Sequence, residues 1–134
     1  MNIVIRKYEM TDYFMVHDLL KEVFDVEKVN NSNNDNYIEF VAVVDDKVVG
    51  YALLTRVLNY VKNSNYYLLD YVCVNENYRN KGIGKELLKE VSKEASIDGE
   101  YIELTSSYKR EAAHHVYEEL GYIKKESNIF RKVF

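Results

Sequence analysis

The sequence predicts a mixed α/β fold of the α+β kind, with a single, mostly antiparallel sheet flanked by helices. Short β-rich runs alternate along the chain with runs whose apolar residues recur at helical spacing. Two of the β-rich runs are separated only by a tight polar turn, which indicates an antiparallel hairpin. The length of 134 residues suits one hydrophobic core, so we expect a single domain over residues 1–134.

The first half of the chain is predicted to form a strand, a helix and a hairpin. Residues 2–8 alternate in hydropathy, as a half-buried strand does, and the Asn-rich residues 30–36 are typical of a surface loop. Residues 37–61 hold two apolar runs hinged on Asp45, Asp46 and Lys47. Thr11 can cap a helix that runs to about residue 25, with an inward face of Phe14, Leu19, Leu20, Val23 and Phe24.

The next two elements are a strand and a helix. Residues 66–74 are almost continuously apolar, so they are expected to form a central strand covered on both faces. Gly99 is suited to the left-handed conformation that ends many helices. The helix before it, within residues 81–97, is predicted to turn one face inward, formed by Ile83, Leu87, Leu88, Val91 and Ala95.

A strand, a helix and a hairpin are expected to complete the chain. Residues 101–105 read as a strand, and residues 122–134 as a closing hairpin. Gly121 follows the last apolar position of the helix and is expected to stop it. The inward residues of this helix, within residues 109–120, are expected to be Ala112, Ala113, Val116, Tyr117 and Leu120.

Composition and charge exclude several classes of protein. A hydrophobic fraction of 47% with 30% charged residues is that of a soluble globular protein. No apolar run approaches the roughly 20 residues that span a bilayer, and the first residues lack a secretory h-region. The net charge of −4 argues against a nucleic-acid partner and agrees with a cationic acceptor such as an amine. We therefore expect a cytoplasmic protein with neither a membrane nor a nucleic acid as partner.

The cysteine and histidine content argues against disulfides and metals. Cys73 is the single cysteine, so no intrachain disulfide can form. It lies within an apolar run, which favours a small buried hydrophobe over a nucleophile. The three histidines, His17, His114 and His115, have no ligand spacing around them, so we expect no metal site.

A glycine-rich loop carries the strongest functional signal. Gly82 and Gly84 stand between the predicted central strand and the next helix, beside Arg79, Lys81 and Lys85. The free amides at a helix N-terminus attract anions, and glycine lets an anion approach the backbone closely. The spacing matches neither a mononucleotide P-loop nor a dinucleotide fingerprint. We favour a loop that binds a diphosphate over the alternative, a glycine-rich turn whose basic side chains are only solvated.

Two motifs resemble those of the GNAT superfamily of N-acetyltransferases. "YRNKGIGKELL" resembles the acetyl-CoA signature R/Q-x-x-G-x-G/A followed by an amphipathic helix. "AAHHVYEELGY" resembles the second motif, A-x-x-x-Y-x-x-x-G-F/Y, at the expected distance downstream. The two motifs cover residues 70–122, and the predicted order of elements extends the resemblance over nearly the whole chain. The resemblance implies the GNAT acyl-CoA N-acyltransferase fold, acetyl-CoA as cofactor and a primary amine of a small molecule as acceptor.

The resemblance also implies which residues hold the cofactor. Those around the diphosphate would be Arg79, Asn80, Lys81, Gly82, Ile83, Gly84 and Lys85. Val72 and Val74 would offer backbone groups to the pantetheine arm, and a backbone N–H near Val72 or Cys73 would stabilise the oxyanion of acyl transfer. In such proteins the strand splays from its neighbour after a bulge near this point. Dimers are common in this superfamily, so a homodimer is compatible with the resemblance.

The resemblance places two further residues in the chemistry. Tyr117 matches the family tyrosine near the cofactor sulfur, where it can protonate the departing thiolate, because a tyrosine hydroxyl carries its proton at pH 7. On apolar periodicity alone, Tyr117 would be read as a core residue. Asp70 takes the place where several relatives carry a carboxylate, and it is the leading candidate for the base. A chain of waters without one dedicated base is the rival explanation.

The sequence departs from the usual pattern in one place. Arg110 stands seven residues before Tyr117, where many relatives carry asparagine, and "LTSSYK" precedes it. The resemblance implies that Ser106, Ser107 and Arg110 contact the cofactor or the acceptor. The alternative for Arg110 is an ion pair on the surface. The predicted activity is that of an acetyl-CoA-dependent N-acetyltransferase. The alternatives are a non-catalytic acyl-CoA-binding module and an acetyltransferase for protein N-termini or lysines.

Overall fold

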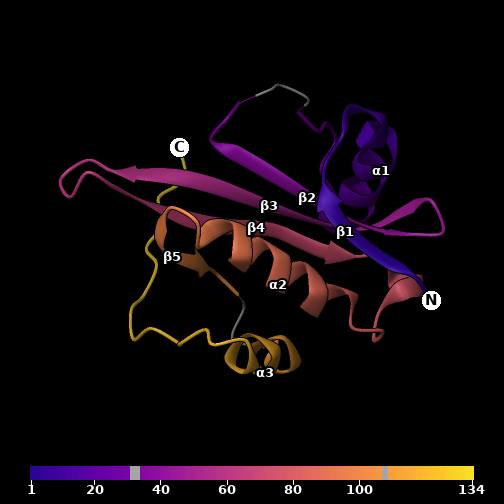
Figure 1. Cartoon of the computed structure of the whole chain (residues 1–134). Helices are drawn as coiled ribbons and strands as arrows, with labels where there is room; N and C mark the ends of the chain where they lie inside the picture. Colours follow the sequence, from indigo (N-terminus) through magenta and orange to yellow (C-terminus); the bar gives the residue numbers. More distant parts are fainter. Residues whose placement is uncertain (31–33, 107–108) are drawn as a thin grey trace.

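One open sheet organises the chain in the computed structural model, which describes residues 1–30, 34–106 and 109–134 (Figure 1). The described strands follow the order β1-β2-β3-β4-β5; β4 and β5 are parallel, and the other neighbours are antiparallel. The predicted mixed, mostly antiparallel sheet is therefore confirmed. The strands are β1 (Ile3–Lys7), β2 (Tyr37–Val44), β3 (Lys47–Asn59), β4 (Ser64–Val74) and β5 (Gly99–Leu104).

Helices cover the two faces of this sheet unequally (Figure 1). Because side chains alternate along a strand, Phe40 and Ala42 pack toward α2 (Ile83–Ala95), whereas Val41 between them packs toward α1 (Tyr13–Phe24). α3 (Glu111–Glu119) adds partly buried residues to the α2 side. The prediction that the strand at 66–74 is covered on both faces is only half right, because Asp70 and Tyr71 of β4 are exposed.

The β2–β3 hairpin and α2 follow the sequence prediction closely. Asp45 and Asp46 both have positive φ, which suits the right-handed twist of the strands they join. Gly82 precedes the first residue of α2. The buried residues of α2 are those predicted from its periodicity, namely Ile83, Leu87, Leu88, Val91 and Ala95.

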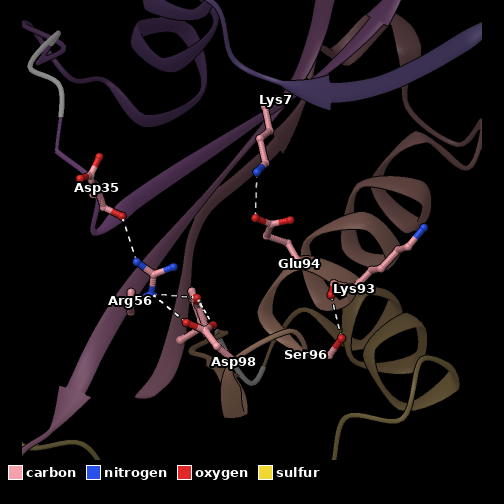
Figure 2. Close-up of polar contacts among 8 residues, drawn as sticks. Lys7, Asp35, Arg56, Lys93, Glu94, Ser96 and Asp98 are labelled. Carbon is pink, nitrogen blue, oxygen red and sulfur yellow. Dashed lines mark hydrogen bonds and ion pairs between the residues drawn. The ribbon is translucent and has the colours of Figure 1, made fainter. Parts of the chain in front are cut away.

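Polar contacts hold the C-terminal end of α2 against the sheet (Figure 2). Lys7 Nζ on β1 donates to Glu94 Oε1 at 2.8 Å. The buried Tyr67 donates its hydroxyl hydrogen to Asp98 Oδ1 at 2.5 Å and accepts from Arg56 Nε at 3.0 Å. Arg56 also lies 3.4 Å from Asp98 Oδ2. These contacts tie the last turn of α2 and the residues after it to β1, β3 and β4.

The predicted cap of the first helix is wrong. α1 begins at Tyr13, after a 3-10 turn over Met10–Asp12, and Thr11 caps nothing. Asp12 accepts from Arg6 through both oxygens, at 2.8 and 2.9 Å, and from the Glu9 N–H at 2.8 Å. The hydrogen bonds from Arg6 lower the pKa of Asp12. Phe14, predicted to face inward, is 78% exposed, because the buried stripe instead runs through Val16, Leu19 and Leu20.

The role predicted for Gly99 is also wrong, although Gly121 behaves as expected. Gly121 has φ +91° and follows the end of α3. Gly99 instead has no positive φ and is the first residue of β5. A Cβ at Gly99 would lie 2.6 Å from the Ala95 carbonyl oxygen and 2.7 Å from Tyr67 Cδ1. Glycine is required there because the chain passes very close to the end of α2.

The closing hairpin predicted over residues 122–134 does not form. These residues contain no strand, and they leave α3 as an irregular segment, drawn yellow in Figure 1. β5 therefore has β4 as its one strand neighbour among the described residues. Of the loop predicted at 30–36, residues 31–33 lie outside the described residues, as does Ser107.

We predict that Gly99→Ala lowers the free energy of unfolding by about 1–3 kcal/mol, because the added methyl group meets a backbone carbonyl and a buried ring. Gly84→Ala is the matched control, since its methyl would meet Val74 Cγ2 at an ordinary 3.8 Å. Alanine also suits a helix better than glycine by roughly 0.5–1 kcal/mol. Urea unfolding measures the free energy of unfolding of both variants. Equal stability of the two would contradict the packing explanation.

Candidate functional site

A bulge in β4 opens the sheet at one end. Tyr51 pairs with Cys73 and Leu53 pairs with Asp70, so Tyr71 and Val72 together oppose the single residue between Tyr51 and Leu53. Tyr71 takes the left-handed conformation, with φ +55°. Pairing between β4 and β5 reaches Leu69 with Leu104 and goes no further among the described residues. The last residues of β4 therefore lack a strand partner on the β5 side.

The backbone of Val74 points into this opening. Asn75 N donates to Val49 O at 2.7 Å, which makes that pair hydrogen-bonded across β3 and β4. Since hydrogen-bonded and non-hydrogen-bonded pairs alternate in an antiparallel ladder, the pair Val74 and Gly50 is of the second kind. The N–H and C=O of Val74 then point away from β3. The side chain of Arg79 agrees with this, because its Nε donates to Val74 O at 3.1 Å.

The loop after β4 delivers an uncapped helix N-terminus to the same place. Asn75 Oδ1 accepts from Asn77 N at 2.9 Å and so starts the turn toward α2. Gly82 occupies the cap position with φ +82°, a conformation that glycine adopts at little cost. No side chain caps α2. Its first amides are therefore available to an anion.

A cavity of about 320 Å³ joins these features. All the residues predicted to hold the cofactor, except Lys81, line it together with Tyr117. Lys81 instead lines a neighbouring hollow beside the N-terminal residues, which shares Gly82 with the cavity. The lining residues that were also predicted from the sequence are Val72, Cys73, Val74, Arg79, Asn80, Gly82, Ile83, Gly84, Lys85 and Tyr117.

Helix α3 forms the opposite wall of the cavity. Tyr117 is partly buried, and its ring lies 6.0 Å from that of Tyr122. The two hydroxyl groups differ, because Tyr122 Oη lies 3.1 Å from Ser92 Oγ whereas Tyr117 Oη forms no hydrogen bond within the described residues. Burial raises the pKa of Tyr122. Tyr117 is thus the tyrosine of this pair whose hydroxyl is free for a ligand.

The cavity is lined by basic rather than acidic side chains. Arg79, Lys85 and Arg110 line it, and no Asp, Glu or His belongs to its described lining. Lys85 Nζ lies 3.2 Å from Glu119 Oε2 on α3, and this hydrogen bond is the main cause of the lowered pKa of Glu119. His115 Nε2 lies 3.0 Å from the other oxygen of Glu119. One carboxylate thus restrains Lys85 beside the cavity.

Several lining residues were not predicted from the sequence as part of a site. Ala112 and Ala113 belong to the second motif, so the motif could have indicated them. Tyr78, Leu88 and Val116 carried no functional signal. These five residues complete the described lining of the cavity.

Asp70 and Ser106 do not line the cavity. Asp70 lies on the face of β4 opposite α2, and it is exposed to solvent as an ordinary surface carboxylate is. Ser106 Oγ is buried and has no hydrogen-bond partner among the described residues. The structure therefore brings together Tyr117 and the predicted cofactor residues except Lys81, and leaves the predicted base outside.

Cys73 is buried, with 6% of its surface exposed. Burial raises the pKa of its thiol to about 12. Its side chain packs with Val16, Leu19 and Tyr51 on the α1 side of the sheet. These observations agree with a buried hydrophobe rather than a nucleophile.

The described residues show no cluster of three or more His, Cys, Asp or Glu side chains that could hold a metal ion. The helices within those residues are also too short or too polar to cross a bilayer.

Comparison with known families identifies the chain. The profile of the acetyltransferase (GNAT) family matches residues 4–122, which is most of the sequence. The protein therefore belongs to the GNAT acetyltransferase family. A search of curated protein sequences finds no match.

Solved structures share the fold at low sequence identity. An aminoglycoside acetyltransferase from an uncultured soil metagenomic sample, in complex with trehalose, superposes with a TM-score of 0.85 at 17% identity, over 98% of this chain and 95% of that one. The ribosomal-protein-alanine N-acetyltransferase of Brucella melitensis gives 0.81 at 18% identity, over 99% and 100%. The glucosamine-6-phosphate N-acetyltransferase of Arabidopsis thaliana gives 0.79 at 16% identity, over 98% and 99%.

We predict that iodoacetamide alkylates Cys73 very slowly in the folded protein at about pH 8. A pKa raised to about 12 leaves almost no thiolate at that pH, and the thiolate is the nucleophile. In concentrated urea the thiol should react as an ordinary cysteine does. Mass spectrometry of timed samples measures both rates, and similar rates in the two states would contradict the assignment of Cys73 as a buried core residue.

Proposed function

We propose that this protein is an acetyl-CoA-dependent N-acetyltransferase that acts on a primary amine of a small molecule. One observation carries the proposal: the unpaired end of β4, the uncapped N-terminus of α2 and the free hydroxyl of Tyr117 meet at one cavity. A thioester cofactor with a diphosphate needs such a set of groups, because it presents anionic oxygens, amide groups and a leaving sulfur.

The donor set of the cavity fits coenzyme A. The first amides of α2, with Arg79 and Lys85 beside them, would hold the diphosphate. The outward N–H and C=O of Val74, with the neighbouring backbone of Val72, would pair with the amide groups of the pantetheine arm. Family membership supports the same cofactor.

The residues of the chain would have distinct roles in the reaction. When bound, acetyl-CoA supplies an acetyl thioester that a neutral amine can attack. Tyr117 would hold, on its hydroxyl, the proton that the departing thiolate takes up to become the free thiol. A backbone N–H near Val72 or Cys73 would stabilise negative charge on the carbonyl oxygen.

The acidic face of the sheet supports an amine as acceptor. Glu39 and Asp70 both pair across the sheet with Leu53, so their side chains lie on the same row and on the face opposite α2. Tyr51 Oη donates to Glu39 Oε1 at 2.6 Å, and burial raises the pKa of this tyrosine, so it stays a donor. Two carboxylates beside the bulge would attract a protonated amine. The solved aminoglycoside and glucosamine-6-phosphate enzymes with this fold are named for small-molecule acceptors.

The proposal is tested by incubating the protein with acetyl-CoA and a panel of small amines, and by following release of free thiol. We predict that Tyr117→Phe lowers kcat for the best amine by roughly 10²- to 10⁴-fold, the usual contribution of a general acid. The KM for acetyl-CoA should change little, since the ring that packs in the cavity is kept.

Tyr122→Phe is the matched control for Tyr117→Phe. It removes a hydroxyl from a neighbouring ring, but one that already bonds to Ser92. Its kcat should stay near that of the unmodified protein. Equal losses in the two variants, or a loss in cofactor affinity alone for Tyr117→Phe, would assign Tyr117 to packing.

We predict that Glu119→Gln tightens binding of coenzyme A roughly two- to five-fold, because Lys85 loses its carboxylate partner and a negative charge beside the diphosphate is removed. Glu118→Gln is the control, since Glu118 is exposed on α3 and has no ion-pair partner within the described residues. Isothermal titration calorimetry measures both affinities. Weaker binding by Glu119→Gln would show that Lys85 does not serve the diphosphate.

A non-catalytic acyl-CoA-binding module is the second candidate. One observation favours it, namely that no Asp, Glu or His belongs to the described lining of the cavity. Coenzyme A would then bind, whereas no amine in the panel would release thiol, and Tyr117→Phe would leave binding unchanged. Thiol release with any amine of the panel would exclude this candidate.

A further inference from the structure

Tyr71 is an unusual residue for the backbone conformation that it adopts. Its φ of +55° lies in the left-handed region, where a bulky side chain crowds the backbone and where Asp and Asn are tolerated best. The other non-glycine residues with positive φ in the described ranges follow this preference, namely Asp25, Asp45, Asp46, Asn63 and Asn80. A tyrosine at this one position therefore needs a reason of its own.

Packing does not supply that reason. Tyr71 is 46% exposed and belongs to neither cluster of the hydrophobic core. Its hydroxyl forms no hydrogen bond within the part of the chain that the structure describes. The ring meets that of Phe24, the last residue of α1, edge to face with centroids 5.1 Å apart. Phe24 is itself 38% exposed, so the pair presents aromatic surface to solvent.

The bulge that gives Tyr71 this conformation also directs its ring. The next residue, Val72, packs on the α2 side of the sheet and lines the cofactor cavity. Tyr71 contacts Phe24 of α1, so the two neighbours lie on opposite faces of β4. The ring thus begins one residue from the backbone proposed to serve the thioester, on the face that carries Asp70.

The surroundings of the two rings suit an amine with an apolar body. Asp70 directly precedes Tyr71, and Glu39 lies across the partly buried Leu53 in the same row, so carboxylates for an ammonium group adjoin the rings. α1 ends at Phe24, and the negative end of its dipole also favours a cation. A hydrocarbon that covers the rings is removed from water. The hydroxyl groups of a sugar would find few partners on the same surface.

We propose that Tyr71 and Phe24 select the acceptor, and that the acceptor is a primary amine carried on an apolar body. This inference rests on the proposed N-acetyltransferase function. The body would lie against the two rings while its amine reaches past Asp70 to the thioester. Tyr71 is then a specificity-determining residue, held for its ring in a conformation that costs stability.

Thiol release with 2-phenylethylamine, glucosamine and ethanolamine tests the proposal. kcat/KM should be highest for 2-phenylethylamine. Tyr71→Asn and Phe24→Ala should each lower this value roughly tenfold or more, because the apolar body loses its contact, and should change that for ethanolamine far less. Tyr71→Phe keeps the ring and should retain the preference. Phe14→Ala is the control for Phe24→Ala, since Phe14 is 78% exposed on the same helix.

Urea unfolding of Tyr71→Asn separates recognition from packing. Asparagine suits the left-handed conformation, so this variant should unfold at the same urea concentration as the unmodified protein or a higher one. A lower midpoint would assign Tyr71 to packing and overturn the inference.

Two kinetic results would overturn the inference and leave the proposed function standing. One is a higher kcat/KM for glucosamine than for 2-phenylethylamine. The other is an equal loss for 2-phenylethylamine and ethanolamine in Tyr71→Asn. Absence of thiol release with every amine would overturn the proposed function, and this inference with it.

Discussion

The separation of β4 from its neighbour is the constraint on which the site depends. A sheet that continued its pairing past Leu69 and Leu104 would use every backbone group of β4 internally. The bulge at Tyr71 and Val72, with Tyr71 held in the left-handed region, bends the strand where that pairing stops. The resulting free edge faces the N-terminus of α2, so backbone groups of two different elements become available to one ligand.

The charge of the cavity is local and opposes the charge of the whole chain. The sequence carries a net charge of −4, yet Arg79, Lys85 and Arg110 gather around the uncapped end of α2. The acidic residues near this region lie elsewhere, with Glu119 against Lys85 and with Asp70 on the other face of the sheet. In the proposed function, an anionic cofactor and a cationic acceptor would therefore approach from different faces of the same strand.

The parts of the structure that could be predicted are those fixed by short-range patterns. The inward face of α2 follows from its periodicity, the hairpin from Asp45 and Asp46, and the grouping of the glycine loop with Tyr117 from two motifs. The failures arise from contacts between distant residues. Thr11 does not cap α1, because Asp12 stands directly before the helix and is held there by two hydrogen bonds from Arg6. Gly99 lies so close to Tyr67 that a Cβ would not fit, and no local sequence pattern reveals this contact. The pairing of Lys85 with Glu119 joins two helices and is equally invisible in the sequence.

In the proposed reaction, the positions of the carboxylates indicate where the amine proton would go. The described lining of the cofactor cavity contains no Asp, Glu or His side chain, and its ionisable members are the buried Cys73, two tyrosines, two arginines and Lys85. Glu39 and Asp70 stand on the opposite face, one on each side of Leu53. Asp70 is exposed and Glu39 accepts from Tyr51, so both are better placed to receive a proton through water than by direct contact beside Tyr117. This arrangement favours the water chain over Asp70 as a dedicated base. It also separates the two proton transfers of the proposed reaction, with loss of the amine proton on one side of β4 and protonation of the thiolate on the other.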